Sequence, residues 1–192
     1  MLPWYHNIQY SRPSFPADPY GFTQTDRRSH ANVALEFLLN DSGLEFLSEQ
    51  TLPSGQRLYN ERELSHMQDV KSVTQITLNL WRASLAVTLC TVLSLAWRTS
   101  TRAMLRSGLI VGSSIVVVSI LVLGLYIMLN FNSFFTHFHE VLFESGTWTF
   151  TYSDTLIRLF PLKFWADVFV IVSGASLLEG MLLLWAALRF QS

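Results

Sequence analysis

Charged residues are scarce in this chain of 192 residues: they make up 14%, whereas an ordinary soluble domain carries about 25%. The formal net charge is −1, and no basic run is present that could bind nucleic acid or an acidic surface. Cys90 is the one cysteine, so an internal disulfide is excluded, and its apolar neighbours offer no metal ligands. The low charge is typical of a membrane protein, and the length fits one domain.

Familiar catalytic signatures are also absent. The Gly-x-Ser-x-Gly, His-Glu-x-x-His, Walker and dinucleotide-binding patterns do not occur. Nothing therefore calls for a cofactor or a resident metal, and any chemistry has to come from ordinary side chains. Histidines are the first candidates, and there are five of them: His6, His30, His66, His137 and His139.

Three apolar stretches are long enough to cross a bilayer, whose core of about 30 Å needs roughly 20 helical residues. They cover residues 73–97, 108–130 and 166–188. The middle stretch contains β-branched residues, but a lone segment in lipid has to satisfy its backbone internally and therefore forms a helix. The sequence predicts an all-α integral membrane protein with three transmembrane helices and a small helical extracytoplasmic segment.

The loops predict the orientation of these spans. The 98–107 loop holds Arg98, Arg102 and Arg106 and no acid, so the positive-inside rule places it in the cytoplasm. The 189–192 tail is then cytoplasmic as well, while segments 1–72 and 131–165 are extracytoplasmic. No signal or anchor precedes the first of these, so we expect a further apolar helix upstream in the parent protein, and four helices in all.

The first extracytoplasmic segment contains two predicted helices. Thr25 and Asp26 can cap a helix over about 25–40, because apolar residues recur there at helical spacing. Asn60 can cap the next helix, and no breaker separates that helix from the first span. We therefore expect it to continue into the membrane as one helix.

His66 lies where the first span leaves the membrane. On a helix, Glu63 and Asp69 lie one turn away, and a carboxylate there can fix the tautomer and orientation of an imidazole. The alternative is an interfacial histidine that pairs with Asp69 and has no catalytic role.

A second candidate site is the aromatic segment 130–143. On a helix, one arc would carry Phe131, Phe134, Phe135 and Phe138, and His139 would lie at its edge beside Phe143. Desolvation keeps a histidine there neutral and basic, as a general base requires. The alternative is an aromatic interfacial belt with an incidental histidine. A strand over 137–139 would instead point His137 and His139 the same way, as a metal site with His66 would need.

Two polar residues lie within the predicted spans. Glu179 stands among the small residues Ser173, Gly174, Ser176 and Gly180, so we expect it to be neutral and hydrogen-bonded to another helix. Arg82 lies nearer the outer boundary, where its long side chain can reach the interface.

Several short motifs follow one another over roughly residues 20–170. They are Tyr20-Gly21-Phe22-Thr23, Glu63-x-x-His66-Met67-x-Asp69-Val70-Lys71, Phe138-His139-x-x-x-Phe143, Trp148-x-Phe150, Asp154-x-Leu156-Ile157 and Phe160-Pro161-x-x-Phe164-x-x-Asp167. In order and interval this set resembles the bacterial lipoprotein intramolecular transacylases and their uncharacterised integral membrane relatives. The resemblance implies a protein of the bacterial cell membrane.

The resemblance also implies an activity. Such enzymes move an acyl chain from the diacylglyceryl group of a lipoprotein onto the amine of its N-terminal cysteine, so the implied partners are membrane lipid and a diacylated lipoprotein. The essential histidines of the family fall on His66 and His139. On that basis His139 is the expected base or nucleophile and His66 assists it. Supporting roles are expected for Asp69, Lys71, Trp148 and Asp154, and a lipid pocket is expected from Phe131, Phe134, Phe135, Phe138 and Phe143.

Two other functions stay open at this point. The chain could be a non-enzymatic membrane protein or subunit, in which both histidines would tolerate substitution. It could also be another lipid-modifying or hydrolytic enzyme that uses the same histidines. The oligomeric state is not indicated by the sequence.

Overall fold

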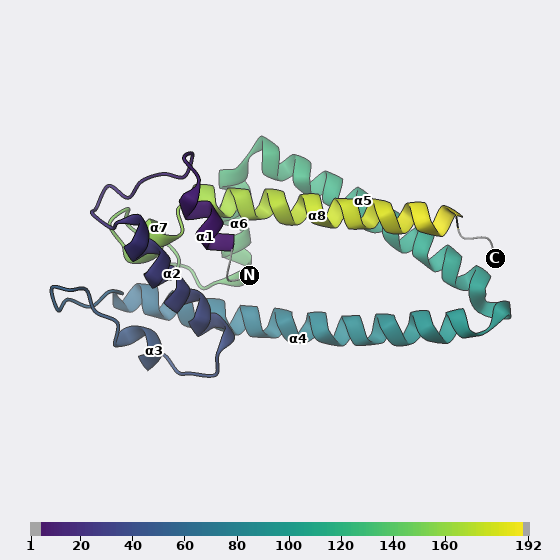
Figure 1. The fold of residues 1–192 in the computed structure, drawn as a ribbon, viewed down its shortest axis with the longest axis horizontal. Helices are drawn as coiled ribbons and strands as arrows, with labels where there is room; N and C mark the ends of the chain where they lie inside the picture. The colour runs from purple at the N-terminus through teal and green to yellow at the C-terminus, as the bar shows by residue number, and fades with distance from the viewer. Residues whose placement is uncertain (1–4, 190–192) are drawn as a thin grey trace. The chain divides into compact units, whose positions relative to one another are not determined.

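The computed structural model describes residues 5–189, and these residues are largely helical (Figure 1). The all-α prediction is confirmed, because the described range contains no strand, only an isolated bridge between Thr51 and Arg57. Residues 1–4 and 190–192, which include most of the predicted cytoplasmic tail, lie outside the description. The helices are α1 Tyr5–Ser11, α2 Gln24–Leu39, α3 Glu45–Ser48, α4 Glu61–Trp97, the 3₁₀ helix η1 Thr99–Thr101, α5 Arg102–Leu129, α6 Phe131–Leu142, α7 Thr155–Leu159 and α8 Leu162–Arg189.

Three helical segments are long and apolar enough to cross a membrane, as predicted. They are α4, the Thr99–Leu129 segment that contains η1 and α5, and α8. The 37 residues of α4 extend about 55 Å, well beyond the roughly 30 Å of a bilayer core. Its residues up to Leu78 belong to a different compact unit from the remainder of the helix.

The arginine-rich segment 98–107 is mostly helical rather than a loop. Only Arg98 separates α4 from η1, and Arg102 and Arg106 lie on the first turns of α5. The hydroxyl of Thr101 donates to the carbonyl oxygens of Leu95 and Arg98, at 2.7 and 3.0 Å. These bonds satisfy carbonyl groups at the end of α4 and allow this tight turn.

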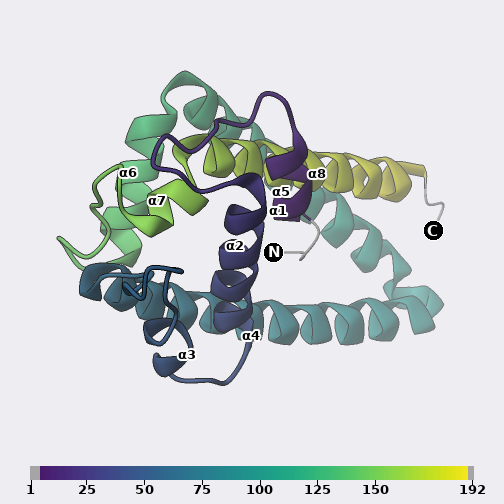
Figure 2. The ribbon, with the colours of Figure 1, turned by 60° about the vertical axis from the view of Figure 1, so that its left-hand side comes forward.

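The chain forms two compact units. Unit 1 comprises Met1–Leu78 and Thr136–Ala166, and unit 2 comprises Asn79–Phe135 and Asp167–Ser192. In unit 1, α1 and α7 lie beside α2 (Figure 2). The side chains of its hydrophobic core come from α2, α3, α4, α7 and the segment before α4: Ala34, Phe37, Leu47, Leu58, Tyr59, Leu64, Met67, Leu156 and Leu159.

The cap of helix α2 lies two residues before the predicted one at Thr25. Thr23 is the N-cap, and its hydroxyl and backbone exchange hydrogen bonds with Asp26 in a capping box. The buried face of α2 carries Arg27, Ala31, Ala34 and Phe37. The buried face of α2 is therefore not purely apolar, because its first turn carries a buried arginine.

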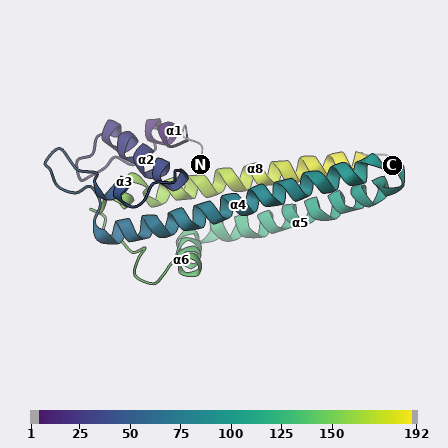
Figure 3. The same ribbon diagram turned by 90° about the horizontal axis from the view of Figure 1, so that it is seen from below.

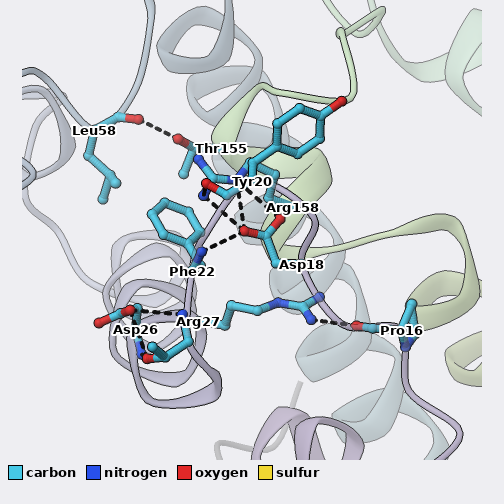
Figure 4. Close-up of polar contacts among 10 residues, drawn as sticks. Pro16, Asp18, Tyr20, Phe22, Asp26, Arg27, Leu58, Thr155 and Arg158 are labelled. Atoms are coloured by element: carbon cyan, nitrogen blue, oxygen red, sulfur yellow. Dashed lines mark hydrogen bonds and ion pairs between the residues drawn. The ribbon is translucent and has the colours of Figure 1, made fainter.

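A buried ion pair fastens the segment before α2 to α7 (Figure 4). Arg158 donates to both carboxylate oxygens of Asp18, the shortest distance being 2.9 Å, and its guanidinium lies over the ring of Phe22 at 3.4 Å. The backbone N–H of Phe22 donates to the same carboxylate at 2.7 Å. Burial alone would raise the pKa of Asp18, but these hydrogen bonds hold it below its usual value. In Figure 4, Arg27 similarly donates to the carbonyl oxygen of Pro16.

Within unit 2, α5 packs closely on α8. A Cβ atom added to Gly180 would lie 3.1 Å from Cγ2 of Val117, so the absent side chain allows the close approach. The expected hydrogen bond from Glu179 to another helix is not formed within residues 5–189, where its side chain is exposed. The reason is geometric, because residue 180 faces α5 and its neighbour, about 100° around the helix, does not.

The end of α5 carries an aromatic cluster of its own. Helix α5 ends at Asn130, whose backbone is not helical, and α6 begins at the next residue (Figure 3). The ring of Phe134 packs edge-on against Phe169 at 4.8 Å, and Phe131 lies 6.1 Å from Phe169. Elsewhere in unit 2, Arg82 donates to Asn79 at 3.1 Å from an exposed position.

Candidate active site

Two histidines from different helices meet in unit 1. His66 lies in the second turn of α4 and His139 lies near the end of α6. Their ring centroids are 6.1 Å apart, and the ring planes are inclined by 21°. Both side chains are buried, at 8% and 9% exposure. A shared site needs groups within reach of one substrate atom or water, and this separation meets that condition.

An aromatic shell surrounds the pair. The rings of Phe143 and Phe150 pack against the His66 ring in T-shaped arrangements, with centroid distances of 4.9 and 5.3 Å. The Trp148 ring lies 5.1 Å from His139, and Phe138 lies 5.5 Å from it on the same helix. The imidazoles are therefore set in an apolar environment, which disfavours the charged form of either ring.

The loop after α6 carries Trp148 and Phe150 into this shell. The turn from Glu144 to Thr147 is closed by a backbone hydrogen bond of 3.2 Å, and Gly146 within it has a φ angle of +90°. That left-handed conformation suits glycine because it has no Cβ atom. Beyond the turn, Arg62 of α4 donates to the carbonyl oxygen of Thr149 at 2.9 Å. The loop is thus fastened to the helix that carries His66.

Glu63 anchors the start of α4 beneath the site. Its fully buried carboxylate accepts hydrogen bonds from the backbone N–H groups of Asn60 at 2.9 Å and Leu156 at 2.7 Å. The pKa of Glu63 is raised because burial outweighs the lowering effect of these backbone donors. Sequence reasoning treated Glu63 only as a neighbour of His66. Its signal was the Asn60-x-x-Glu63 spacing, which is that of a helix cap.

His66 is electrically neutral at physiological pH. Burial, and secondarily the neighbouring His139, lowers the pKa of His66 to about 4. Its Nδ1 atom is shielded from solvent and has no hydrogen-bond partner in the described part of the chain. The same holds for the indole Nε1 of Trp148. The site therefore contains two polar atoms whose hydrogen bonding is not satisfied by residues 5–189.

Asp69 is not the partner of His66 that we expected. Asp69 is half-buried on α4, Nδ1 of His66 neither accepts nor donates a hydrogen bond within the described range, and Asp69 is not among the groups that shift the pKa of His66. The physical reason is that the His66 ring is turned into the shell of Phe143 and Phe150. The orientation of His66 is set by ring packing instead of a carboxylate.

Lys71 and Asp154 have structural contacts. Lys71 donates to the side chain of Asn40 at 3.1 Å and lies over the ring of Phe37 at 4.2 Å, so it ties α4 to the end of α2. Asp154 is the N-cap of α7 and accepts hydrogen bonds from the Thr151 backbone and from Asn60, at 2.8 and 3.2 Å. Both residues hold together the elements that carry the site.

The predicted lipid-pocket aromatics do not all share one unit. Phe138 and Phe143 contact His139 in unit 1. Phe131, Phe134 and Phe135 belong to unit 2. The segment 137–139 is helical, so the strand that a His137–His139 metal site needs is not formed, and no group of three or more potential ligands occurs among residues 5–189. His137 is exposed on α6.

Comparison with known proteins gives this arrangement a context. A family model described as "Lipoprotein intramolecular transacylase Lit" matches residues 1–165. The chain belongs to the lipoprotein intramolecular transacylase family. The matched range contains both histidines of the pair and the whole aromatic shell around them.

A similar protein comes from Aquifex aeolicus (strain VF5). It is 33% identical over 181 residues, which cover 94% of this chain and 80% of the relative, and it is described as an uncharacterised protein. No solved structure matches the chain. The family resemblance first indicated by the ordered motifs is thereby confirmed.

Proposed function

We propose that this protein is a membrane acyltransferase of the transacylase type. It moves an acyl chain from the diacylglyceryl ester of a lipoprotein to the α-amine of that lipoprotein's N-terminal cysteine. The observation that carries the proposal is the approach of His66 and His139 to 6.1 Å within an apolar shell, inside the range that matches the family.

The reaction is an ester aminolysis. The neutral α-amine nitrogen attacks the ester carbonyl carbon, and His139 accepts a proton from that nitrogen as general base. When the bond between the carbonyl carbon and the glyceryl oxygen breaks, the protonated His139 returns the proton to the leaving oxygen. The products are an amide and a free glyceryl hydroxyl, with no net gain or loss of protons.

His66 assists this step as a neutral imidazole. Burial lowers the pKa of His66 to about 4, so this ring is uncharged when the amine attacks. The amine and the ester belong to one lipoprotein molecule, so holding them in place supplies much of the rate enhancement. The apolar shell formed by Phe143 and Phe150 excludes water that would otherwise hydrolyse the ester.

We further propose that unit 1 faces the extracytoplasmic side of a bacterial cell membrane. The cluster of Arg98, Arg102 and Arg106 lies at the opposite end of α4 from His66, and positive residues mark the cytoplasmic side. In this orientation the site lies where diacylated lipoproteins are displayed.

Expression of the full chain with a diacylated lipoprotein reporter tests the function. Mass spectrometry of the reporter's N-terminal peptide should show one acyl group on the amine and one left on the glyceryl group. His139→Ala should abolish this product, whereas His137→Ala, an exposed histidine on the same helix, should retain it. Unchanged acyl positions with folded, membrane-inserted protein would refute the transacylase proposal, and release of free fatty acid would indicate a hydrolase.

A further inference from the structure

The indole of Trp148 has an unusual place in the site. Its Nε1–H group is shielded from solvent and has no hydrogen-bond partner among residues 5–189, although its ring lies 5.1 Å from His139. Buried tryptophan N–H groups usually find an acceptor, because a buried donor without a hydrogen bond costs free energy. A donor left unpaired beside the proposed base therefore needs an explanation beyond packing.

The position of this indole is built by several contacts. The turn with Gly146 directs the chain back toward α4, and Arg62 holds the carbonyl of Thr149 directly after the tryptophan. Phe150 then packs its ring edge-on against His66. A side chain held this firmly keeps its N–H oriented before a ligand arrives, which is the condition for electrostatic stabilisation without reorganisation.

We propose that Trp148 is a catalytic residue: its Nε1–H donates a hydrogen bond to the carbonyl oxygen of the reacting ester. This inference rests on the proposed function. An indole nitrogen can only donate, so its ligand has to present an acceptor. The hydrogen bond strengthens as negative charge develops on that oxygen during attack by the amine. Nδ1 of His66 and Nε1 of Trp148 are both shielded from solvent, so the substrate has to displace part of the aromatic shell when it binds.

The chemistry of the neighbourhood selects an uncharged acceptor. The rings in contact with the histidine pair are Phe138, Phe143, Trp148 and Phe150, and none of them carries a charge. A permanent anion would lose its hydration against these four uncharged rings, whereas an ester carbonyl is neutral until the reaction begins. The unpartnered donor therefore fits the carbonyl of an ester better than a carboxylate or a phosphate.

Replacement of the N–H group alone provides the sharpest kinetic test. Trp148→Phe removes the donor and keeps a ring, and β-(3-benzothienyl)alanine at position 148 keeps the shape while sulfur replaces N–H. We expect both to lower kcat on a diacylated lipopeptide about 100-fold, with KM changed less than about threefold. The matched control is Trp165→Phe in unit 1, which contacts Phe160 and Phe164 and should keep the rate.

A binding measurement makes the inference independent of turnover. In ¹⁵N-labelled protein in detergent, the indole resonance missing from Trp148→Phe identifies Trp148. A diacylated lipopeptide with an acetylated amine, which cannot react, should shift that indole proton downfield. The ether-linked analogue, which keeps the amides but lacks the ester carbonyl groups, should not. Equal shifts with both probes, or no shift with either, would overturn the inference.

The outcomes separate the two proposals. If the wild-type protein converts the lipopeptide and the benzothienyl variant is equally fast, Trp148 is not a catalytic donor and the transacylase function still stands. If the wild-type protein leaves the lipopeptide unchanged, the proposed function fails, and the indole resonance still decides whether Trp148 binds an ester carbonyl.

Discussion

Glu63 near the start of α4 accepts a hydrogen bond from the backbone N–H of Leu156 at the start of α7, at 2.7 Å. The same carboxylate accepts the backbone N–H of Asn60, so one buried side chain caps α4 and fastens α7 to it. His66 is one turn further along α4. The placement of this histidine therefore depends on a carboxylate that takes no part in the chemistry.

Removal of this carboxylate should destabilise unit 1. Glu63→Ala leaves the N–H groups of Asn60 and Leu156 without their acceptor, and we expect the free energy of unfolding to fall by about 2–4 kcal/mol. The measurement is thermal or denaturant unfolding of the purified protein in detergent. Glu61→Ala is the matched control, because Glu61 is exposed and its ion pair with Arg57 lies at the surface, so a change under about 0.5 kcal/mol is expected. Equal losses in the two variants would contradict the anchoring role of Glu63.

The charge state of His66 should change well below physiological pH. Burial and His139 lower the pKa of His66 to about 4, against 6.5 for the unperturbed group, so the unfolded chain takes up the proton first. The contribution to stability is therefore complete above pH 6.5 and is lost as the pH falls toward 4, by about 3 kcal/mol at most.

NMR titration of the His66 imidazole measures this directly. The neighbouring His139 contributes to the lowered pKa of His66, so His139→Ala should raise that pKa. A midpoint near 6.5 in the wild-type protein would show that the ring is solvated. Because His66 stays neutral down to about pH 4, a loss of activity between pH 7 and 5 would report the protonation of another group.

The turn before Trp148 should require glycine. Gly146→Ala places a Cβ atom at a φ angle of +90°, and we expect a loss of about 1–2 kcal/mol in stability together with lower transacylase activity, because the indole is displaced. Gly124→Ala is the control: this glycine lies inside α5 with open space where the added methyl group would lie, so stability should be unchanged or slightly higher. Full activity in Gly146→Ala would show that the turn accepts a side chain at residue 146 without displacing the indole of Trp148.

The Asp18–Arg158 pair should behave as one unit. The Arg158 and Asp18 side chains are only 11% and 1% exposed, so removing one partner leaves a largely shielded charge uncompensated, and we expect Asp18→Ala or Arg158→Ala to cost about 3 kcal/mol each. The double variant should cost clearly less than the sum of the single variants. The exposed Arg57–Glu61 pair serves as the comparison, with a coupling energy below about 0.5 kcal/mol. Additive losses at Asp18 and Arg158 would show that the pair does not fasten the segment before α2 to α7.

Features that depend on local order along the chain were predictable. The apolar stretches that contain Cys90, Val117 and Gly180 are longer than a bilayer core requires, and each stretch forms a helix. The absence of a breaker after Asn60 likewise predicted that α4 would be continuous with the first span. These properties follow from the chemistry of consecutive residues, because a segment in lipid has to satisfy its own backbone.

Which side chains meet was decided by the tertiary structure. His66 was assigned to Asp69 because they lie one turn apart, yet its ring packs on Phe143 and Phe150, which belong to a distant loop. Glu179 was expected to bond across helices, but the small residue next to it forms the contact with α5 instead. Helical periodicity specifies the angle of a side chain about its own axis. It does not specify which other element occupies that direction, because that depends on the path of the whole backbone.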